Sequence, residues 1–322
     1  MKALVTGGAG FIGNWLCREL LAKGDEVLVL DDLSSGRYEN LEELESGGRL
    51  RLVVDTVNDP AIVNECVKEV DIVFHLASAV GVRMIIDRPV HTIKSIVGGT
   101  ETVLQACARY RRPVVFTSTS EVYGKGAKIP FSEEDDRVMG ATTMRRWSYA
   151  TAKALDEFLA LAYWYEARLP IVIARLFNTV GPRQTGRYGM VVPSLVRQAL
   201  RDEPLTVYGD GQQSRCFTHV QDVVRCLVAL SGCKDARGEV VNIGSTEEVT
   251  ILELAQRIRT LTGSKSDILM VPYSEAYGEG FDDMRRRVPA LEKAARLVGY
   301  QPTLSLDDIL NDVIAHEREN AC

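Results

Sequence analysis

A tyrosine and a lysine stand four residues apart in the segment SYATAK, as Tyr149 and Lys153. In a helix this spacing puts both side chains on one face, about one turn apart. An ammonium group near a phenol lowers the pKa of the phenol, so Tyr149 could act near neutral pH as a base toward a substrate hydroxyl. Because YxxxK also occurs by chance in many helices, the pair needs other residues beside it to indicate a site.

A second set of polar residues lies in TSTSEVYG (117–124), at the end of an apolar, β-branched run. It offers hydroxyls at Thr119 and Ser120 and a carboxylate at Glu121. Parallel α/β sheets bind their ligands at the carboxyl ends of the strands, where this segment is expected to lie. These three residues, together with the tyrosine and the lysine, predict a catalytic site.

A glycine-rich segment, TGGAGFIG, places Gly7, Gly10 and Gly13 between the first expected strand and the first expected helix. Such glycines allow a tight turn and bring backbone N–H groups at a helix N-terminus close to a pyrophosphate. The second expected strand ends in Asp31, near the spacing at which a carboxylate holds a ribose 2′-hydroxyl. The combination predicts a dinucleotide site.

The acidic residue at this position also discriminates between cofactors. A carboxylate at Asp31 would repel a 2′-phosphate, so NAD is favoured over NADP. The neighbouring Asp32 leaves open which of the two acids binds the ribose. Asp55, at the end of the third expected strand, could bond the adenine amino group or could equally cap the strand end.

The elements that must position these residues alternate between strands and helices. Helical periodicity covers 11–24, 61–70, 98–110 and 148–167, between short apolar runs. This βαβ pattern predicts an α/β, doubly wound parallel sheet of the Rossmann type. The expected strands are 2–6, 26–31, 51–55, 71–77, 113–119, 170–177 and 239–244.

After about residue 180 the pattern becomes irregular, with helices expected near 190–202, 220–231, 251–262, 289–298 and 305–317 and a strand at 205–209. This part resembles a smaller α+β cap that binds substrate. Since 239–244 is expected to return to the main sheet, the domains are discontinuous. We assign 1–178 and about 215–246 to an NAD-binding domain, and about 179–214 and 247–322 to a substrate-binding domain.

Composition narrows the class of protein. The 322 residues are 46% apolar and 25% charged, which is typical of a folded globular chain. A net charge of −6 argues against nucleic acid or an anionic membrane as the main partner. The seven scattered cysteines have no metal-ligand spacing, so no metal site is expected. Free thiols and the absence of a secretory signal pattern predict a cytoplasmic location.

These motifs together resemble one known family, the extended short-chain dehydrogenases, in the branch of nucleotide-sugar epimerases, dehydratases and decarboxylases. The resemblance covers essentially the whole chain. Its motifs are TGGAGFIG with Asp31, DIVFHLA, TSTSEVYG, YATAK, LFNTVGPR, VYGDGQQSRCFTHVQDVV and NIG. One departure is Ile96, which stands where relatives usually carry an asparagine.

The resemblance implies roles for individual residues. Tyr149 would be the base, Lys153 would hold the nicotinamide ribose, and Thr119 would bond the sugar 4-hydroxyl. It also implies cofactor contacts from Phe11, Ile12, Leu76 and Ala77, and nucleoside-diphosphate contacts from Asn178, Arg215 and Arg287. Candidate partners for a substrate carboxylate are Arg83, Arg183 and Arg187.

The family oxidises C4 of a nucleotide sugar with NAD, and its members differ in the next chemical step. A C6 carboxylate allows loss of carbon dioxide, a C6 hydroxyl allows loss of water, and rotation of the ketone allows epimerisation. The order Thr119, Ser120, Glu121 resembles the decarboxylases and some dehydratases. In contrast, AVGVR (79–83) and GPRQ (181–184) resemble uronate 4-epimerases.

Our leading hypothesis is decarboxylation of UDP-glucuronate to UDP-xylose or its 4-keto pentose. The alternatives are a 4-epimerase of UDP-glucose or UDP-glucuronate, a 4,6-dehydratase or apiose-type synthase, and a non-catalytic NAD-binding sensor. The family also often dimerises, so we expect a homodimer through the helices at about 98–110 and 148–167. The side chains expected on their outer faces are Val103, Leu155, Leu159 and Trp164.

Overall fold

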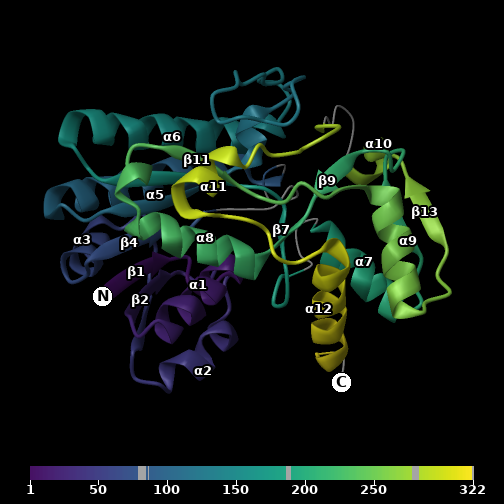
Figure 1. The fold of residues 1–322 in the computed structure, drawn as a ribbon, viewed down its shortest axis with the longest axis horizontal. Helices are drawn as coiled ribbons and strands as arrows, with labels where there is room; N and C mark the ends of the chain where they lie inside the picture. Colours follow the sequence, from purple (N-terminus) through teal and green to yellow (C-terminus); the bar gives the residue numbers. More distant parts are fainter. Residues whose placement is uncertain (79–84, 86, 186–189, 278–282, 321–322) are drawn as a thin grey trace.

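The structure is a computed structural model that describes residues 1–78, 85, 87–185, 190–277 and 283–320. A seven-stranded parallel sheet is covered by helices on both faces, and a smaller group of helices and short strands lies beside it (Figure 1). The strands of the large sheet are β1 (Lys2–Thr6), β2 (Glu26–Asp31), β3 (Leu50–Val54), β4 (Ile72–His75), β5 (Val114–Thr119), β6 (Ile171–Leu176) and β11 (Val240–Ile243).

The strand order is β11-β6-β5-β4-β1-β2-β3, and every neighbouring pair is parallel. The predicted doubly wound sheet is therefore confirmed, including the return of the late strand β11 to the edge beside β6. The direction of winding reverses between β1 and β4, and ligands of such sheets bind where this reversal occurs.

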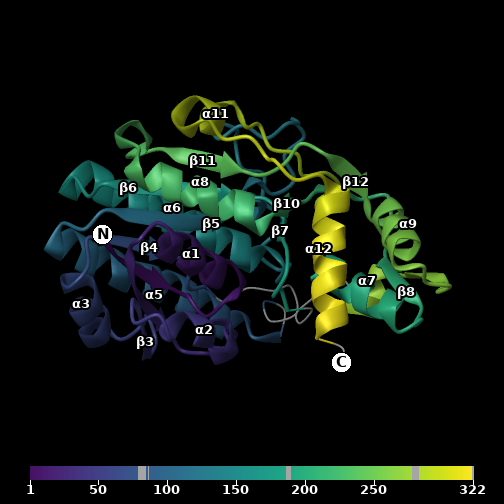
Figure 2. The ribbon, with the colours of Figure 1, turned by 60° about the horizontal axis from the view of Figure 1, so that its bottom comes forward.

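Alternation along β1 explains why the strands are apolar on both faces. Ala3 and Val5 pack with α1 and α8, whereas Leu4 packs on the opposite face with α3, α5 and α6. Burial on both faces gives the nearly continuous apolar runs of a parallel sheet. Figure 2 shows α1 and α8 in front of the sheet. These helices are α1 (Phe11–Ala22), α3 (Pro60–Lys68), α5 (Pro89–Tyr110), α6 (Trp147–Ala167) and α8 (Val220–Gly232).

The smaller part has its own apolar core, built from α7 (Val191–Leu200), α9 (Ile251–Thr262) and α12 (Leu306–Glu319). Capping boxes begin α9 at Thr250 and α12 at Ser305. The remaining elements are η1 (Tyr38–Asn40), α2 (Glu42–Glu45), η2 (Ser120–Tyr123), β7 (Thr179–Val180), β8 (Leu205–Tyr208), β9 (Ser214–Cys216), β10 (Thr218–His219), η3 (Lys234–Ala236), β12 (Glu248–Thr250), β13 (Ile268–Val271), α10 (Tyr273–Tyr277) and α11 (Glu292–Val298).

Candidate active site

The glycine-rich turn between β1 and α1 leaves no room for side chains. Gly7 has φ +73, and a Cβ there would lie 2.8 Å from the Ala77 amide nitrogen. A Cβ on Gly13 would lie 2.1 Å from the Gly7 carbonyl oxygen. Gly10 is the N-cap of α1. The turn, the start of α1 and the end of β4 therefore lie close together, at a helix N-terminus of the kind at which backbone amides bind a pyrophosphate.

The structure separates the two adjacent acids at the end of β2. Asp31 is buried, and its carboxylate accepts hydrogen bonds from the amides of Ala9 and Leu33, both at 2.9 Å. Asp32 instead accepts from the amide and hydroxyl of Ser34 at the exposed side. Burial raises the pKa of Asp31, and its backbone hydrogen bonds oppose this shift. Asp31 is thus the acid that lies against the glycine-rich turn.

Five further predicted cofactor contacts lie at the same edge of the sheet. The amides of Leu76 and Ala77, just beyond β4, both donate to the Thr6 hydroxyl oxygen at 3.2 Å. Asp55 follows β3 and accepts from the Thr56 amide at 2.7 Å, which is the strand-end cap considered as its alternative role. Phe11 and Ile12 open α1 and pack against the core. Their contacts with a dinucleotide stay predictions.

The tyrosine and the lysine both belong to the first turns of α6. Lys153 is buried, with its Nζ 4.0 Å from the centre of the Phe116 ring and 3.6 Å from Asp156 Oδ2. Tyr149 shares a hydrogen bond with Thr119, the last residue of β5, and this bond favours its phenolate. The structure therefore places the tyrosine and the lysine of α6 against β5, where Tyr149 meets Thr119 and Lys153 meets Phe116.

The expected effect of this environment on Tyr149 is wrong in one respect. We expected a lowered pKa, but burial and the charge of Glu121 raise the pKa of Tyr149 above its usual value, and the bond to Thr119 only partly opposes them. The Asp156 carboxylate, which lies 3.6 Å from the Lys153 ammonium, also raises the pKa of Tyr149. The phenol therefore needs positive charge beside it to ionise near neutral pH.

Glu121 is the second residue of η2, which follows β5 directly, and its carboxylate is held by two arginines. Arg146 donates to both of its carboxylate oxygens, and Arg287 Nη1 lies 3.4 Å from Oε1. Burial would raise the pKa of Glu121, but the two guanidinium groups outweigh it and keep that pKa below its usual value. The preceding Ser120 is buried at the start of the same turn. Glu121 is therefore a fixed anion.

A buried charge cluster continues from Glu121 into the smaller part. Asp283 pairs with Arg215 at 2.7 Å, with Arg287 at 3.3 Å and with Arg146 at 3.4 Å. Three cations thus surround two anions, so the cluster has positive charge to spare for an anionic ligand. We call Glu121, Arg146, Arg215, Asp283 and Arg287 the arginine cluster.

Arg146 is a residue that our sequence reasoning missed. It is the N-cap of α6, three residues before Tyr149, and its side chain is 3% exposed. Three-residue spacing at the start of a helix puts two side chains on neighbouring positions of one face. This spacing, visible in the run RRWSY, could have indicated that Arg146 lies near Tyr149.

Of the other predicted substrate residues, the structure describes Asn178 and Arg183, which lie in different places. Asn178 donates to the carbonyl of Cys216 at 3.2 Å, next to Arg215, and thus borders the arginine cluster. Arg183 lies apart from that cluster and faces Glu43 at 3.6 Å. Arg83 and Arg187 lie outside the described residues.

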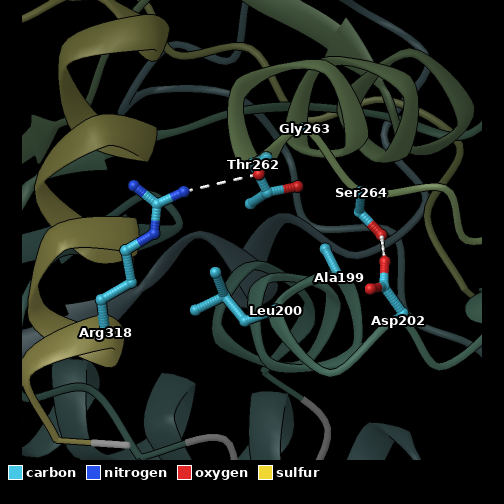
Figure 3. Close-up of a pocket in the computed structure, with 7 residues that line it drawn as sticks. All are labelled: Ala199, Leu200, Asp202, Thr262, Gly263, Ser264 and Arg318. Atoms are coloured by element: carbon cyan, nitrogen blue, oxygen red, sulfur yellow. Dashed lines mark hydrogen bonds between the residues drawn. The ribbon is translucent and has the colours of Figure 1, made fainter.

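A surface hollow in the smaller part lies away from these residues (Figure 3). Arg318 donates to the Thr262 carbonyl at 3.4 Å on one side, and Ser264 donates to Asp202 at 2.8 Å on the other. It is bordered by Ala199, Leu200, Asp202, Thr262, Gly263, Ser264 and Arg318, none of which belongs to the predicted site. This hollow is therefore separate from the predicted site at the sheet edge.

Known proteins resemble this chain over nearly its whole length. Residues 3–244 match the model of the NAD dependent epimerase/dehydratase family. The UDP-N-acetyl-alpha-D-glucosaminuronate decarboxylase of Bacillus cytotoxicus is 41% identical over 99% of this chain and 98% of its own. The chain belongs to the NAD-dependent epimerase/dehydratase family. It is therefore an enzyme of this family, with NAD as its cofactor.

Other family members show how little the fold distinguishes the reactions. UDP-glucuronic acid decarboxylase 1 of Danio rerio is 36% identical over 98% of this chain and 72% of its own. The crystal structure of UDP-glucuronic acid 4-epimerase from Bacillus cereus, in complex with UDP-glucuronic acid and NAD, has a TM-score of 0.90. It is 29% identical, over 99% of this chain and 100% of that one. The reaction therefore depends on the side chains of the site rather than on the fold.

Proposed function

We propose that this enzyme decarboxylates a UDP-linked hexuronate, with UDP-glucuronate as the leading substrate and UDP-xylose or its 4-keto pentose as the product. The observation that carries the proposal is the Glu121 carboxylate, which Arg146 and Arg287 hold as an anion close to Tyr149. A simple return of hydride to C4 gives such a carboxylate no evident task. Sequence similarity to two decarboxylases supports the same reaction. By its name, one of these two enzymes acts on an N-acetylated hexuronate.

The chain's own side chains suit the first chemical step. Tyr149 accepts the proton of the sugar 4-hydroxyl, and Thr119 holds that oxygen by a hydrogen bond. NAD, when bound, supplies the acceptor for the C4 hydride and the same hydride for the later reduction. Lys153 holds the nicotinamide ribose and adds positive charge near the phenol.

The oxidised sugar is a β-keto acid, which determines the second step. The C5–C6 bond breaks, carbon dioxide leaves, and the electron pair passes to the C4 oxygen as an enolate. Tyr149 and Thr119 can stabilise that oxygen by hydrogen bonds, and a proton then returns to C5. Arg215 and Arg287 would hold the diphosphate, and Glu121 would orient the carboxyl group at C6.

Product analysis tests the reaction directly. The enzyme is incubated with UDP-glucuronate, UDP-N-acetylglucosaminuronate and UDP-glucose, and the products are identified by mass spectrometry and proton NMR. We expect loss of carbon dioxide from a hexuronate with little free NADH, since oxidation and reduction occur on one bound sugar. Direct titration should show tighter binding of NAD than of NADP, because Asp31 repels a 2′-phosphate.

Each other product would reject the proposal in a defined way. Formation of the 4-epimer alone would establish the 4-epimerase, which the similarity to the UDP-glucuronic acid 4-epimerase supports as the second candidate. Loss of water from UDP-glucose would establish a dehydratase. No turnover with any of the three would revive the hypothesis of a non-catalytic NAD-binding sensor.

We further propose a homodimer, through α5 and α6. Leu155, Phe158 and Tyr165 of α6 are 52%, 60% and 65% exposed, although all three are large and apolar. Val90 and Ile93 extend this exposed surface on α5. Exposed apolar side chains on two neighbouring helices favour a second copy of the chain as the partner.

Our sequence expectation for this surface needs correction. Of the four residues expected on the outer face, only Leu155 is exposed. Val103 is fully buried in the core beneath α5, and Leu159 and Trp164 pack partly against the same core. The reason is that α6 packs against both the sheet and α5, so its apolar positions face in more than one direction.

Phe158→Asp is expected to convert the dimer into a monomer at micromolar concentration, because a carboxylate would be buried without a partner in the interface. Light scattering measures the mass. Leu269→Asp is the matched control, since Leu269 is a similarly exposed apolar residue of β13 in the smaller part. A parent protein that is already monomeric would contradict this assignment and leave the catalytic proposal unaffected.

The location of the enzyme is part of the same proposal. We place it in the cytoplasm, where the free state of Cys17, Cys66, Cys107, Cys216, Cys226 and Cys233 would be maintained. Within the part of the chain that the structure describes, no helix is long and apolar enough to cross a membrane. In the domain division that we propose from the sequence, the cap binds the sugar and the domain with the large sheet binds the dinucleotide.

A further inference from the structure

A chain of buried hydrogen bonds leads from the glycine-rich side of the sheet to Lys153. It begins at Thr6, the last residue of β1, whose hydroxyl oxygen accepts from the amides of Leu76 and Ala77. The hydroxyl proton of Thr6 is then left to donate to His75 Nδ1, at 2.8 Å. The first bond of the chain therefore has a defined direction.

His75 accepts a hydrogen bond on one ring nitrogen and donates one from the other. It is buried, and burial together with the charge of Lys153 lowers its pKa to about 3, so the ring is neutral. Because Nδ1 accepts from Thr6, the ring proton lies on Nε2 and is donated to Thr100 Oγ1 at 3.3 Å. Thr100 in turn donates to Asp156 Oδ2 at 2.8 Å. Every donor in the chain points toward Asp156.

Asp156 ends the chain and faces the lysine. It is fully buried; its Oδ2 lies 3.6 Å from Lys153 Nζ, whereas Oδ1 has no hydrogen-bond partner among the described residues. A buried carboxylate with so few partners is costly to ionise. Burial raises the pKa of Asp156 to about 6, and Lys153 opposes this shift. Burial also lowers the pKa of Lys153, opposed by Asp156 and Glu157.

The other charged groups around this pair are already engaged. Glu157, the next residue of α6, is held by Arg175 of β6 at 2.7 Å and by the Ser118 hydroxyl of β5. Glu121 and Arg146, which act on Tyr149, bind each other in the arginine cluster. His75 of β4 stays neutral. Asp156 is thus the acid nearest to the Lys153 ammonium that no arginine neutralises among the described residues.

We propose that Asp156 is a positioning residue for the reaction: it holds the Lys153 ammonium through a hydrogen-bond chain anchored at Thr6, and its charge determines the pH range in which Tyr149 and Lys153 work together. The proposal rests on the proposed function only in taking these two residues as the catalytic pair. The same chain ties the lysine to the ends of β1 and β4, where the dinucleotide is expected.

Asp156→Asn tests the charge, because the amide oxygen can still accept from Thr100. Removing a negative charge lowers the pKa of every ionisable neighbour. Both limbs of the pH profile of kcat/KM are therefore expected to move to lower pH, the alkaline limb by about one unit, with little change in KM at the optimum. Glu166→Gln, which removes an exposed acid from the same helix, is the matched control and should leave the profile in place.

Thr100 variants test the hydrogen bond to Asp156 without changing Asp156 itself. Thr100→Val removes the hydrogen bond that favours the ionised Asp156, so its profile should move in the same direction as that of Asp156→Asn. Thr100→Ser keeps the hydroxyl and should restore the parent profile. The proposal would be overturned if variants that fold, as shown by circular dichroism, lost activity while both limbs of their pH profiles stayed in place. The hydrogen-bond chain would then have only a structural role.

A spectroscopic readout keeps this test independent of turnover. With NAD bound, the near-ultraviolet tyrosinate absorbance of each enzyme is compared with that of its Tyr149→Phe counterpart across pH, which isolates Tyr149. The phenolate should form at lower pH in Asp156→Asn than in the parent. If no nucleotide sugar is converted but this shift occurs, the proposed function fails and the role of Asp156 stands; equal titrations in the two backgrounds would refute that role.

Discussion

Tyr149→Phe is expected to slow turnover by on the order of 10²- to 10⁴-fold, the usual cost of losing a general base. The ring keeps its place in the first turn of α6, and only the hydroxyl that bonds Thr119 is lost. Binding of NAD and of UDP should barely change, because neither requires the phenolic proton. Single-turnover kinetics and titration of both ligands measure the two effects separately.

A matched control is available on the same pair of residues. Thr119→Val removes the hydrogen-bond partner but keeps the base, and should cost less than the loss of the phenol. Tyr149→Phe activity within a few-fold of the parent would show that another group accepts the proton, and the proposed mechanism would then be wrong.

Glu121→Gln is expected to depress carbon dioxide release from UDP-glucuronate by about 10²-fold or more while substrate affinity changes little, the pattern of a contact made mainly in the transition state. Glutamine preserves the shape but not the charge that Arg146 and Arg287 hold. Since Glu121 is ionised throughout the neutral range, the loss should be nearly independent of pH there. Carbon dioxide release and equilibrium binding are measured on the same preparations.

This variant also disturbs a buried ion pair, so stability needs its own measurement. Arg146 keeps Asp283 as a partner, and we expect the free energy of unfolding to fall by about 1–3 kcal/mol. Glu134→Gln is the control, because Glu134 is 81% exposed and pairs with Lys293 at the surface. Undiminished carbon dioxide release from a folded Glu121→Gln enzyme would remove Glu121 from the mechanism.

Periodicity predicted the sheet and the main helices because burial on both faces produces long apolar runs, and spacing predicted the pairing of Tyr149 with Lys153. The sequence did not show which of Asp31 and Asp32 meets the glycine-rich turn. The answer depends on where β2 ends and on how its side chains alternate, and two adjacent aspartates do not reveal either. Our prediction of the outer face of α6 was wrong for a similar reason. Apolar spacing does not say which neighbouring element a side chain contacts.

The arginine cluster was harder to predict than the catalytic pair. It joins Glu121, Arg146 and Asp283 from separate segments, and only the folded sheet brings these together. The pKa of Tyr149 was misjudged because the sequence shows the lysine but neither the burial of both groups nor the carboxylate beside the ammonium. Such effects depend on distances between segments rather than on residue type.

The position of β11 at the edge beside β6 has a practical consequence for handling this enzyme. A fragment cut after β6 would end on an open strand edge, and it would lack α8, which covers the Ala3 and Val5 side of the sheet. Unpaired edges and bared apolar surface promote aggregation, so such a fragment should not stay monodisperse. A minimal NAD-binding version must instead splice the strand of residues 240–243 and α8 back onto the N-terminal half.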